Sequence, residues 1–196
     1  MQENDTQQNQ HKTEIKNFDF STEFDTLINA RGRVTPSLLT AVNRYFLYFS
    51  FFESLLLDCS GGQGKCAAYA KVMIERVLFD KDVTNNTFSF FSKRYVGDRQ
   101  RYDSLCGEKK HTKPELKEYY YGVMTAQPED LGIQLELCLF VCFRLRNNLF
   151  HGPKWRHYLK GQEELLLTAG TLIHSIISKA EGKDDWEFQS LLNSND

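Results

Sequence analysis

The sequence predicts an all-α protein, a helical bundle with an irregular insertion in the middle of the chain. At least four segments repeat their apolar residues three and four positions apart, which is the spacing of one face of a helix. No segment shows a convincing strand pattern, and no internal repeat marks a second domain. Helices that each carry one apolar stripe must bury those stripes against one another, which gives a bundle.

The 196 residues suit a single domain with a sizeable core. We expect this helical domain to occupy residues 21–185, between an N-terminal tail (1–20) and a C-terminal tail (186–196). The N-terminal tail is rich in Gln, Asn and charged residues. Because it has too little apolar area to offset the entropy of ordering, we expect it to be mobile.

The first strong helix is expected over about residues 35–59, where Pro36 suits the first turn and Thr35 can cap it. The stretch Ser-Gly-Gly-Gln-Gly-Lys then breaks the chain, and a second helix follows over about residues 66–78. The stretch is similar to a phosphate-binding loop, but it lacks the first glycine, has Cys66 where Ser or Thr is needed and follows a helix. We therefore interpret it as a turn between helices.

Residues 80–114 form the irregular insertion and are compatible with short helices or with a small hairpin. Basic and aromatic residues interleave here, a pattern that suits single-stranded RNA but also fits an ordinary solvated surface, since acidic residues dilute it. The balance slightly favours the ordinary surface. The basic residues are Lys93, Arg94, Arg99, Arg101, Lys109, Lys110 and Lys113, and the aromatic ones are Phe90, Phe91, Tyr95 and Tyr102.

Three further helices are expected in the second half of the chain. Pro114 opens one that runs through about residue 124. Another covers residues 131–150, after the start signal Gln-Pro-Glu-Asp at residues 127–130. The final helix spans about residues 161–181, and its apolar residues fall on one stripe.

Composition and charge narrow the class of protein. The net charge of −2 and the pI near 6.2 exclude a polycation that coats nucleic acid, so any such contact needs a local patch. No apolar run is long enough to span a bilayer, and the N-terminus lacks a hydrophobic signal region. The five cysteines match no zinc-binding spacing. We expect reduced core thiols in a cytoplasmic protein that has no membrane partner.

The segment Leu-Arg-Asn-Asn-Leu-Phe-His-Gly-Pro, residues 145–153, is the most informative part of the chain. Arg146 continues the apolar stripe formed by Leu135, Leu139 and Cys142. An unpaired charge on the apolar side of a helix is costly, so this arginine needs a carboxylate, a phosphate or a wet cleft.

Glu53 is the carboxylate that we expect to meet this need. It follows Phe49 by four residues and precedes Leu56 by three, so it also lies on an apolar face of its helix. A carboxylate on such a face is rarely left unpaired. We expect Glu53 to orient Arg146 or a neighbouring asparagine, with a purely structural ion pair about as plausible as a catalytic role.

His151 lies five residues after Arg146, which separates the two side chains by roughly 140° on a regular helix. They can share a site only if the helix loosens between them, or if a second copy of the chain completes the site. Asn147 lies one turn before His151 and can face the same way. Gly152 and Pro153 should end the helix just after His151, where the negative end of the helix dipole favours a protonated imidazole.

The run Arg-Asn-Asn-Leu-Phe-His-Gly resembles the Arg-x4-His motif of the HEPN superfamily, a family of helical bundles. The aromatic helix that carries Glu53 resembles the acid-bearing first helix of the apea-like branch of that family. The resemblance covers roughly residues 40–180, with residues 80–130 poorly matched.

This resemblance implies a metal-independent ribonuclease of a toxin–antitoxin or phage-defence system that needs no cofactor or metal. It implies that Arg146 and His151 are catalytic, that Asn147 is the polar residue after the arginine and that Glu53 is the supporting acid. It also implies an RNA substrate, a homodimer that brings two motifs into one cleft, and an antitoxin or defence-system partner. Pro153 stands where one branch has a tyrosine that is adenylylated, so that regulation is not implied.

The residue types suit RNA cleavage by attack of the 2′-hydroxyl on the adjacent phosphate. A histidine can move protons near neutral pH, and an arginine can hold the phosphate oxygens as charge builds. The alternative is a catalytically silent HEPN module that binds RNA or a protein partner. Retention of both Arg146 and His151 favours the enzyme.

Overall fold

The computed structural model describes residues 19–151 and 159–181, without the side chains of Phe150 and His151. In these residues every regular element is helical, which confirms the predicted all-α bundle. The elements are α2 (Phe20–Leu27), α3 (Pro36–Leu56), the short 3-10 helix η1 (Gln63–Lys65), α4 (Cys66–Glu75), α5 (Lys81–Val96), α6 (Arg99–Cys106), α7 (Pro114–Ala126), α8 (Leu131–His151) and α9 (Glu163–Ala180).

The helix starts that the sequence marks are confirmed. Thr35 caps α3 by accepting a hydrogen bond from the backbone N–H of Leu38, and Pro36 is the first helical residue. Asp130 accepts from the backbone N–H of Ile133 at 2.9 Å at the start of α8. The Gly-rich stretch forms the turn between α3 and α4, with η1 inside it, as expected for a connection between helices.

The structure of residues 80–114 is more regular than expected. Asp80 caps α5 by accepting from the backbone N–H groups of Asp82 and Val83, and the helix then runs for 16 residues. Only α6 is a short helix, and no hairpin forms in this segment. The buried face of α5 includes Thr84, Thr87 and Ser92, and these polar residues interrupt the apolar stripe in the sequence.

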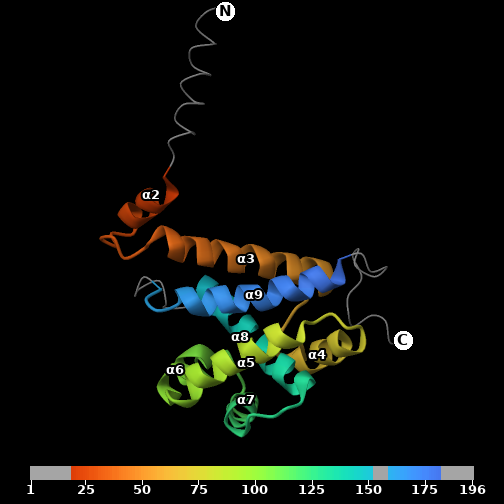
Figure 1. Ribbon diagram of the computed structural model, residues 1–196. Coiled ribbons are helices and arrows are strands. Elements are labelled where there is room, and N and C mark those ends of the chain that lie inside the picture. Colours follow the sequence, from red (N-terminus) through yellow and green to blue (C-terminus); the bar gives the residue numbers. More distant parts are fainter. Residues whose placement is uncertain (1–18, 152–158, 182–196) are drawn as a thin grey trace, which may run out of the picture.

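The sequence reading also missed α2, a helix of eight residues capped by Asp19. It has no buried residue and lies at one end of the bundle, beside the start of α3 (Figure 1). The sequence predicts the N-terminal tail over residues 1–20. Residues 1–18 lie outside the described residues, and the last two, Asp19 and Phe20, are the cap and the first residue of α2. Residues 182–196, with the C-terminal tail, are likewise outside them.

α8 is the central element of the bundle. It contacts α4, α5, α6, α7 and α9, and every residue from Leu137 to Leu145 is buried. α3 and α9 pack along each other over most of their length (Figure 1). The core is rich in aromatic rings; Tyr120, for example, stacks on Phe140 with 4.1 Å between ring centroids.

Four of the five cysteines are buried free thiols, as expected, whereas Cys59 is exposed. Burial raises the pKa of the thiols of Cys138 and Cys142, so they stay protonated. In the described part of the chain, no helix is both long and apolar enough to cross a membrane.

A buried arginine holds the end of α8 to its surroundings. The Arg144 residue is 3% exposed, and burial lowers the pKa of its guanidinium. It donates to the backbone oxygens of Leu105 at 3.1 Å and His111 at 3.3 Å, and to the side-chain oxygen of Gln63 at 3.4 Å. Arg144 therefore joins α8 to η1, to the end of α6 and to the following loop, without a carboxylate partner among the described residues.

Replacing Arg144 by Met should lower the free energy of unfolding by about 2–4 kcal/mol, because the buried oxygens around it lose their donor. Urea unfolding followed by circular dichroism measures the change. The matched control is Lys71→Met at an exposed position of α4, which removes only a weak surface pair with Glu75. Equal stability of the two variants would contradict this role for Arg144.

Candidate functional site

Arg146 and Glu53 form an ion pair between α8 and α3. The Nη2 group of Arg146 donates to Oε1 of Glu53, so the pairing expected from the two stripes is present. The Arg146 side chain is 33% exposed and the Glu53 side chain 16%. The arginine thus lies at the edge of the core, where Glu53 neutralises its charge and part of its side chain contacts solvent.

The position of Glu53 follows from its neighbours on α3. Phe49, Phe52 and Leu56 on the same helix are buried in the core, which draws the Glu53 side chain inward. Gly61 packs against it from the turn after α3. A Cβ atom at Gly61 would lie 3.2 Å from Cγ of Glu53 and 2.9 Å from Leu57, so a larger residue there would displace these side chains.

Two further contacts fix α3 against the last turns of α8. The Tyr45 hydroxyl donates to the backbone oxygen of Cys142 at 2.5 Å, one turn before Arg146. The Phe49 ring packs edge-on against Phe143 at 5.2 Å and lies 5.8 Å from Cζ of Arg146, within range of a cation–π interaction. The Phe49 ring therefore borders the guanidinium on the α3 side.

A cavity of about 360 Å³ lies beside the ion pair, and we call it the Arg146 cleft. Its walls are aromatic and apolar on the α3 side, and Glu53 and Arg146 supply its charges. Its volume is within the range of small-molecule and substrate sites. The lining residues are Tyr45, Phe46, Phe49, Ser50, Glu53, Arg146 and Leu149.

The two asparagines after Arg146 have different surroundings. Asn147 accepts from Nη1 of Arg146 at 2.9 Å and is partly exposed. Asn148 accepts from Nη2 of Arg144 at 3.2 Å and donates to the backbone oxygen of Leu105 at 2.9 Å. Asn147 therefore belongs to the candidate site, whereas Asn148 belongs to the network that holds α8 in place.

The bonds to Glu53 and Asn147 engage two of the five N–H groups of the Arg146 guanidinium, as far as the described residues show. Three donors are left for a ligand. His151 is the last residue of α8, one turn after Asn147, but its side chain lies outside the described part of the structure, as do Gly152 and Pro153.

The basic and aromatic insertion does not form a stacking surface for bases. Phe91, Tyr95 and Tyr102 are buried, so their rings cannot meet a base. Arg99 pairs with both Asp103 and Glu118. The structure thus opposes base stacking by these rings and says nothing against contacts of the basic side chains with phosphates. Among the described residues, no three His, Cys, Asp or Glu side chains gather as possible metal ligands.

Arg144 is the residue that the sequence reading missed. It follows Phe140 by four residues and Val141 by three, and both are buried, so it also lies on an apolar stripe. The apolar stripe that marks Arg146 in the sequence marks Arg144 in the same way. Its partners include backbone oxygens, which leave no mark in the sequence.

The chain matches no family model, no curated protein and no solved structure.

Replacing Arg146 by Met should destabilise the fold by about 1–3 kcal/mol, because Glu53 is then left partly buried without its partner. Adding Glu53→Gln should recover about 1 kcal/mol or more, since the stranded charge is removed. A double-mutant cycle measured by urea unfolding gives this coupling energy.

The exposed pair Lys71 and Glu75, with 3.9 Å between its atoms, is the control and should couple by no more than about 0.5 kcal/mol. Additive effects at Arg146 and Glu53, within about 0.3 kcal/mol, would show that the two side chains do not interact in solution.

Proposed function

We propose that this protein is a metal-independent endoribonuclease of the HEPN kind, a toxin or defence effector in the cytoplasm. The observation that carries the proposal is the Arg146–Glu53 ion pair at the edge of an open cleft, at the end of α8 that leads to His151. The order of residues in the motif supports the same reading, because Arg146, Asn147 and His151 follow one another on this last stretch of helix.

The reaction begins with attack of the RNA 2′-hydroxyl on the adjacent phosphorus. A histidine takes the proton of the hydroxyl, and a protonated histidine gives a proton to the leaving 5′-oxygen. The products are a 2′,3′-cyclic phosphate and a 5′-hydroxyl. In this proposal His151 supplies the proton transfer and Arg146 holds the phosphate oxygens as negative charge builds on them.

Glu53 and Asn147 act by positioning. Each accepts a hydrogen bond from a different nitrogen of Arg146, so the plane of the guanidinium is fixed before substrate binds. An arginine held in place loses less entropy when it meets a phosphate. The aromatic wall of the Arg146 cleft offers an apolar surface for the sugar or base next to that phosphate.

The proposal includes a homodimer, because Arg146 and His151 point to different sides of a regular helix. The outward face of α3 offers a surface for a second copy. Leu47 and Phe51, four residues apart, are exposed on one face of α3, and Phe46, which is also exposed, lines the Arg146 cleft beside this face. Apolar residues gathered on one exposed helix face are typical of an interface. A dimer through this face would place two Arg146 clefts close together.

Incubating the purified protein with RNA should give endonucleolytic cleavage that continues in EDTA and leaves 2′,3′-cyclic phosphate ends. Arg146→Ala should remove the charge stabilisation and His151→Ala the proton transfer, so each should lower the rate by about a hundredfold or more. Product ends are read by mass spectrometry. Glu53→Gln should have a smaller effect, since it acts through Arg146.

An RNA with a single 2′-deoxy position at the cut site is the control for the mechanism. Continued cleavage at that position, or loss of cleavage in EDTA, would exclude attack by the 2′-hydroxyl. If no RNA is cleaved at all, the protein is instead a silent module that binds RNA or another protein.

The protein should be a dimer at micromolar concentration in light scattering, and Phe51→Glu should make it a monomer by burying a charge in the interface. The monomer should also lose RNA cleavage, because the site is then incomplete. Leu27→Glu, at a residue that is 78% exposed on α2, is the matched control and should stay dimeric and active. A wild-type monomer with full activity would overturn this arrangement.

A further inference from the structure

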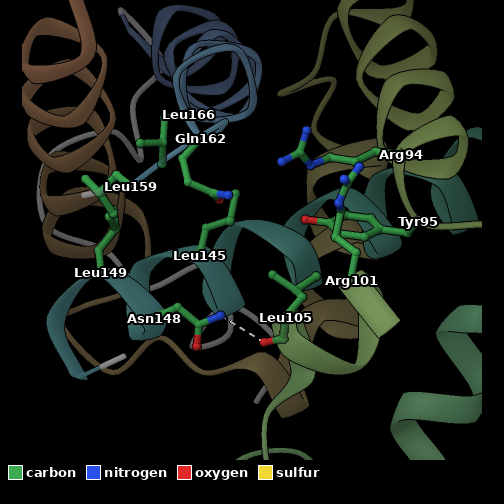
Figure 2. Close-up of a pocket in the computed structure, with 10 residues that line it drawn as sticks. All are labelled: Arg94, Tyr95, Arg101, Leu105, Leu145, Asn148, Leu149, Leu159, Gln162 and Leu166. Atoms are coloured by element: carbon green, nitrogen blue, oxygen red, sulfur yellow. Dashed lines mark hydrogen bonds between the residues drawn. The ribbon is translucent and has the colours of Figure 1, made fainter. Parts of the chain in front are cut away.

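A second concave surface lies at the end of α8, where this helix meets α5, α6 and the start of α9. Its narrow part has a volume of about 20 Å³, room for about one water molecule. Arg94 of α5 and Arg101 of α6 reach into this space beside Tyr95, and Gln162 faces them from the start of α9 (Figure 2).

A wider polar cavity of about 330 Å³ lies beside the narrow part. Arg101, Leu159 and Gln162 line both, so the two adjoin, and we call them together the cationic cavity. The wider part adds Lys160 and Ser104.

The charges of this cavity are unbalanced. Among the described residues, three cations line it, Arg94, Arg101 and Lys160, against the one carboxylate of Asp98. Nε of Arg101 is 3.5 Å from Asp98, and Arg94 donates to the backbone oxygen of Gly161 at 2.8 Å.

In the described part of the chain neither Arg94 nor Lys160 forms an ion pair, whereas Arg99 nearby in sequence pairs with two carboxylates, Asp103 and Glu118. Cations that gather without carboxylates repel one another, and an anion that binds among them relieves this repulsion.

The cationic cavity adjoins the Arg146 cleft. Leu149, in the last described turns of α8, lines both of them. Arg146 lies on one side of Leu149 around the helix, and Leu145 and Asn148 lie on the other. A strand that crosses the end of α8 over Leu149 would therefore pass from the Arg146 cleft into the cationic cavity.

We propose that the cationic cavity binds a backbone phosphate of the RNA strand, next to the phosphate that Arg146 holds. This inference rests on the proposed ribonuclease function. Arg101 and Lys160 provide the charge, and Gln162 and Ser104 provide polar groups for the sugar and phosphate oxygens. Among the described residues that line the cavity, Tyr95 is the only aromatic one and it is buried, so these residues recognise the backbone and tolerate any base.

The test measures binding of a labelled single-stranded RNA by fluorescence anisotropy over a series of salt concentrations. All variants carry His151→Ala, so that the RNA stays intact. The pair Arg101→Gln and Lys160→Gln should weaken binding by about tenfold or more, and should lower the slope of log Kd against log salt by about 0.7 for each lost phosphate contact.

The matched control is the pair Lys71→Gln and Lys81→Gln, which changes the net charge by the same amount on exposed residues of α4 and the start of α5. It should leave both the affinity and the salt slope unchanged. An equal loss in both pairs would mean that only net charge matters, and the cavity proposal would fail.

The outcomes separate this inference from the proposed function. If the wild type cleaves RNA but the Arg101 and Lys160 pair binds normally, the cavity proposal fails and the ribonuclease stands. If the wild type cleaves nothing, yet binds RNA in a way that depends on this pair, the cavity is supported and the enzymatic function fails. If the protein neither binds nor cleaves RNA, both are wrong.

Discussion

The burial of α8 is the constraint on which the rest of the structure depends. A helix that is buried on all sides can carry a cation only where polar partners reach it. α8 carries two arginines, Arg144 and Arg146, about 200° apart around its axis, so they face opposite sides and need partners from different parts of the chain. The end of α6 and η1 meet Arg144, and Glu53 of α3 meets Arg146. The two requirements together determine where these elements pack.

The kinds of partner then decide which arginine can act on a ligand. Neutral oxygens and the side chain of Asn148 surround Arg144, and it is almost fully buried. Among the described residues, Arg146 has one carboxylate partner and N–H groups that bind no other side chain, and it borders a cavity. A guanidinium that is charged, held in place and one-third exposed is suited to bind a phosphate, whereas a buried one bonded to backbone and side-chain amide oxygens is suited to hold elements together. The same residue type, two positions apart, thus serves two purposes.

The sequence was sufficient for the helices with clear apolar stripes and for the pairing of Glu53 with Arg146, because a charged residue on such a stripe must find a partner. It was insufficient for α5, whose buried face includes Thr84, Thr87 and Ser92. It could not give the partners of Arg144, since backbone oxygens exist at every residue. The cationic cavity could not be predicted from the sequence either. Arg94, Arg101 and Lys160 come from separate segments, which are brought together only by the packing of α5, α6 and α9.

The net charge of −2 does not exclude an RNA ligand, because the distribution of charge matters more than its sum. At physiological ionic strength, charges separated by more than about 8 Å are largely screened from one another in water. An RNA strand at the end of α8 therefore responds mainly to the nearest side chains. In the proposed path these are Arg146, Arg101 and Lys160, whereas most other cations near α6 are paired, as Arg99 is with Asp103 and Glu118. A protein with balanced total charge can thus direct a polyanion to one place, the end of α8, where the described cations outnumber the carboxylates.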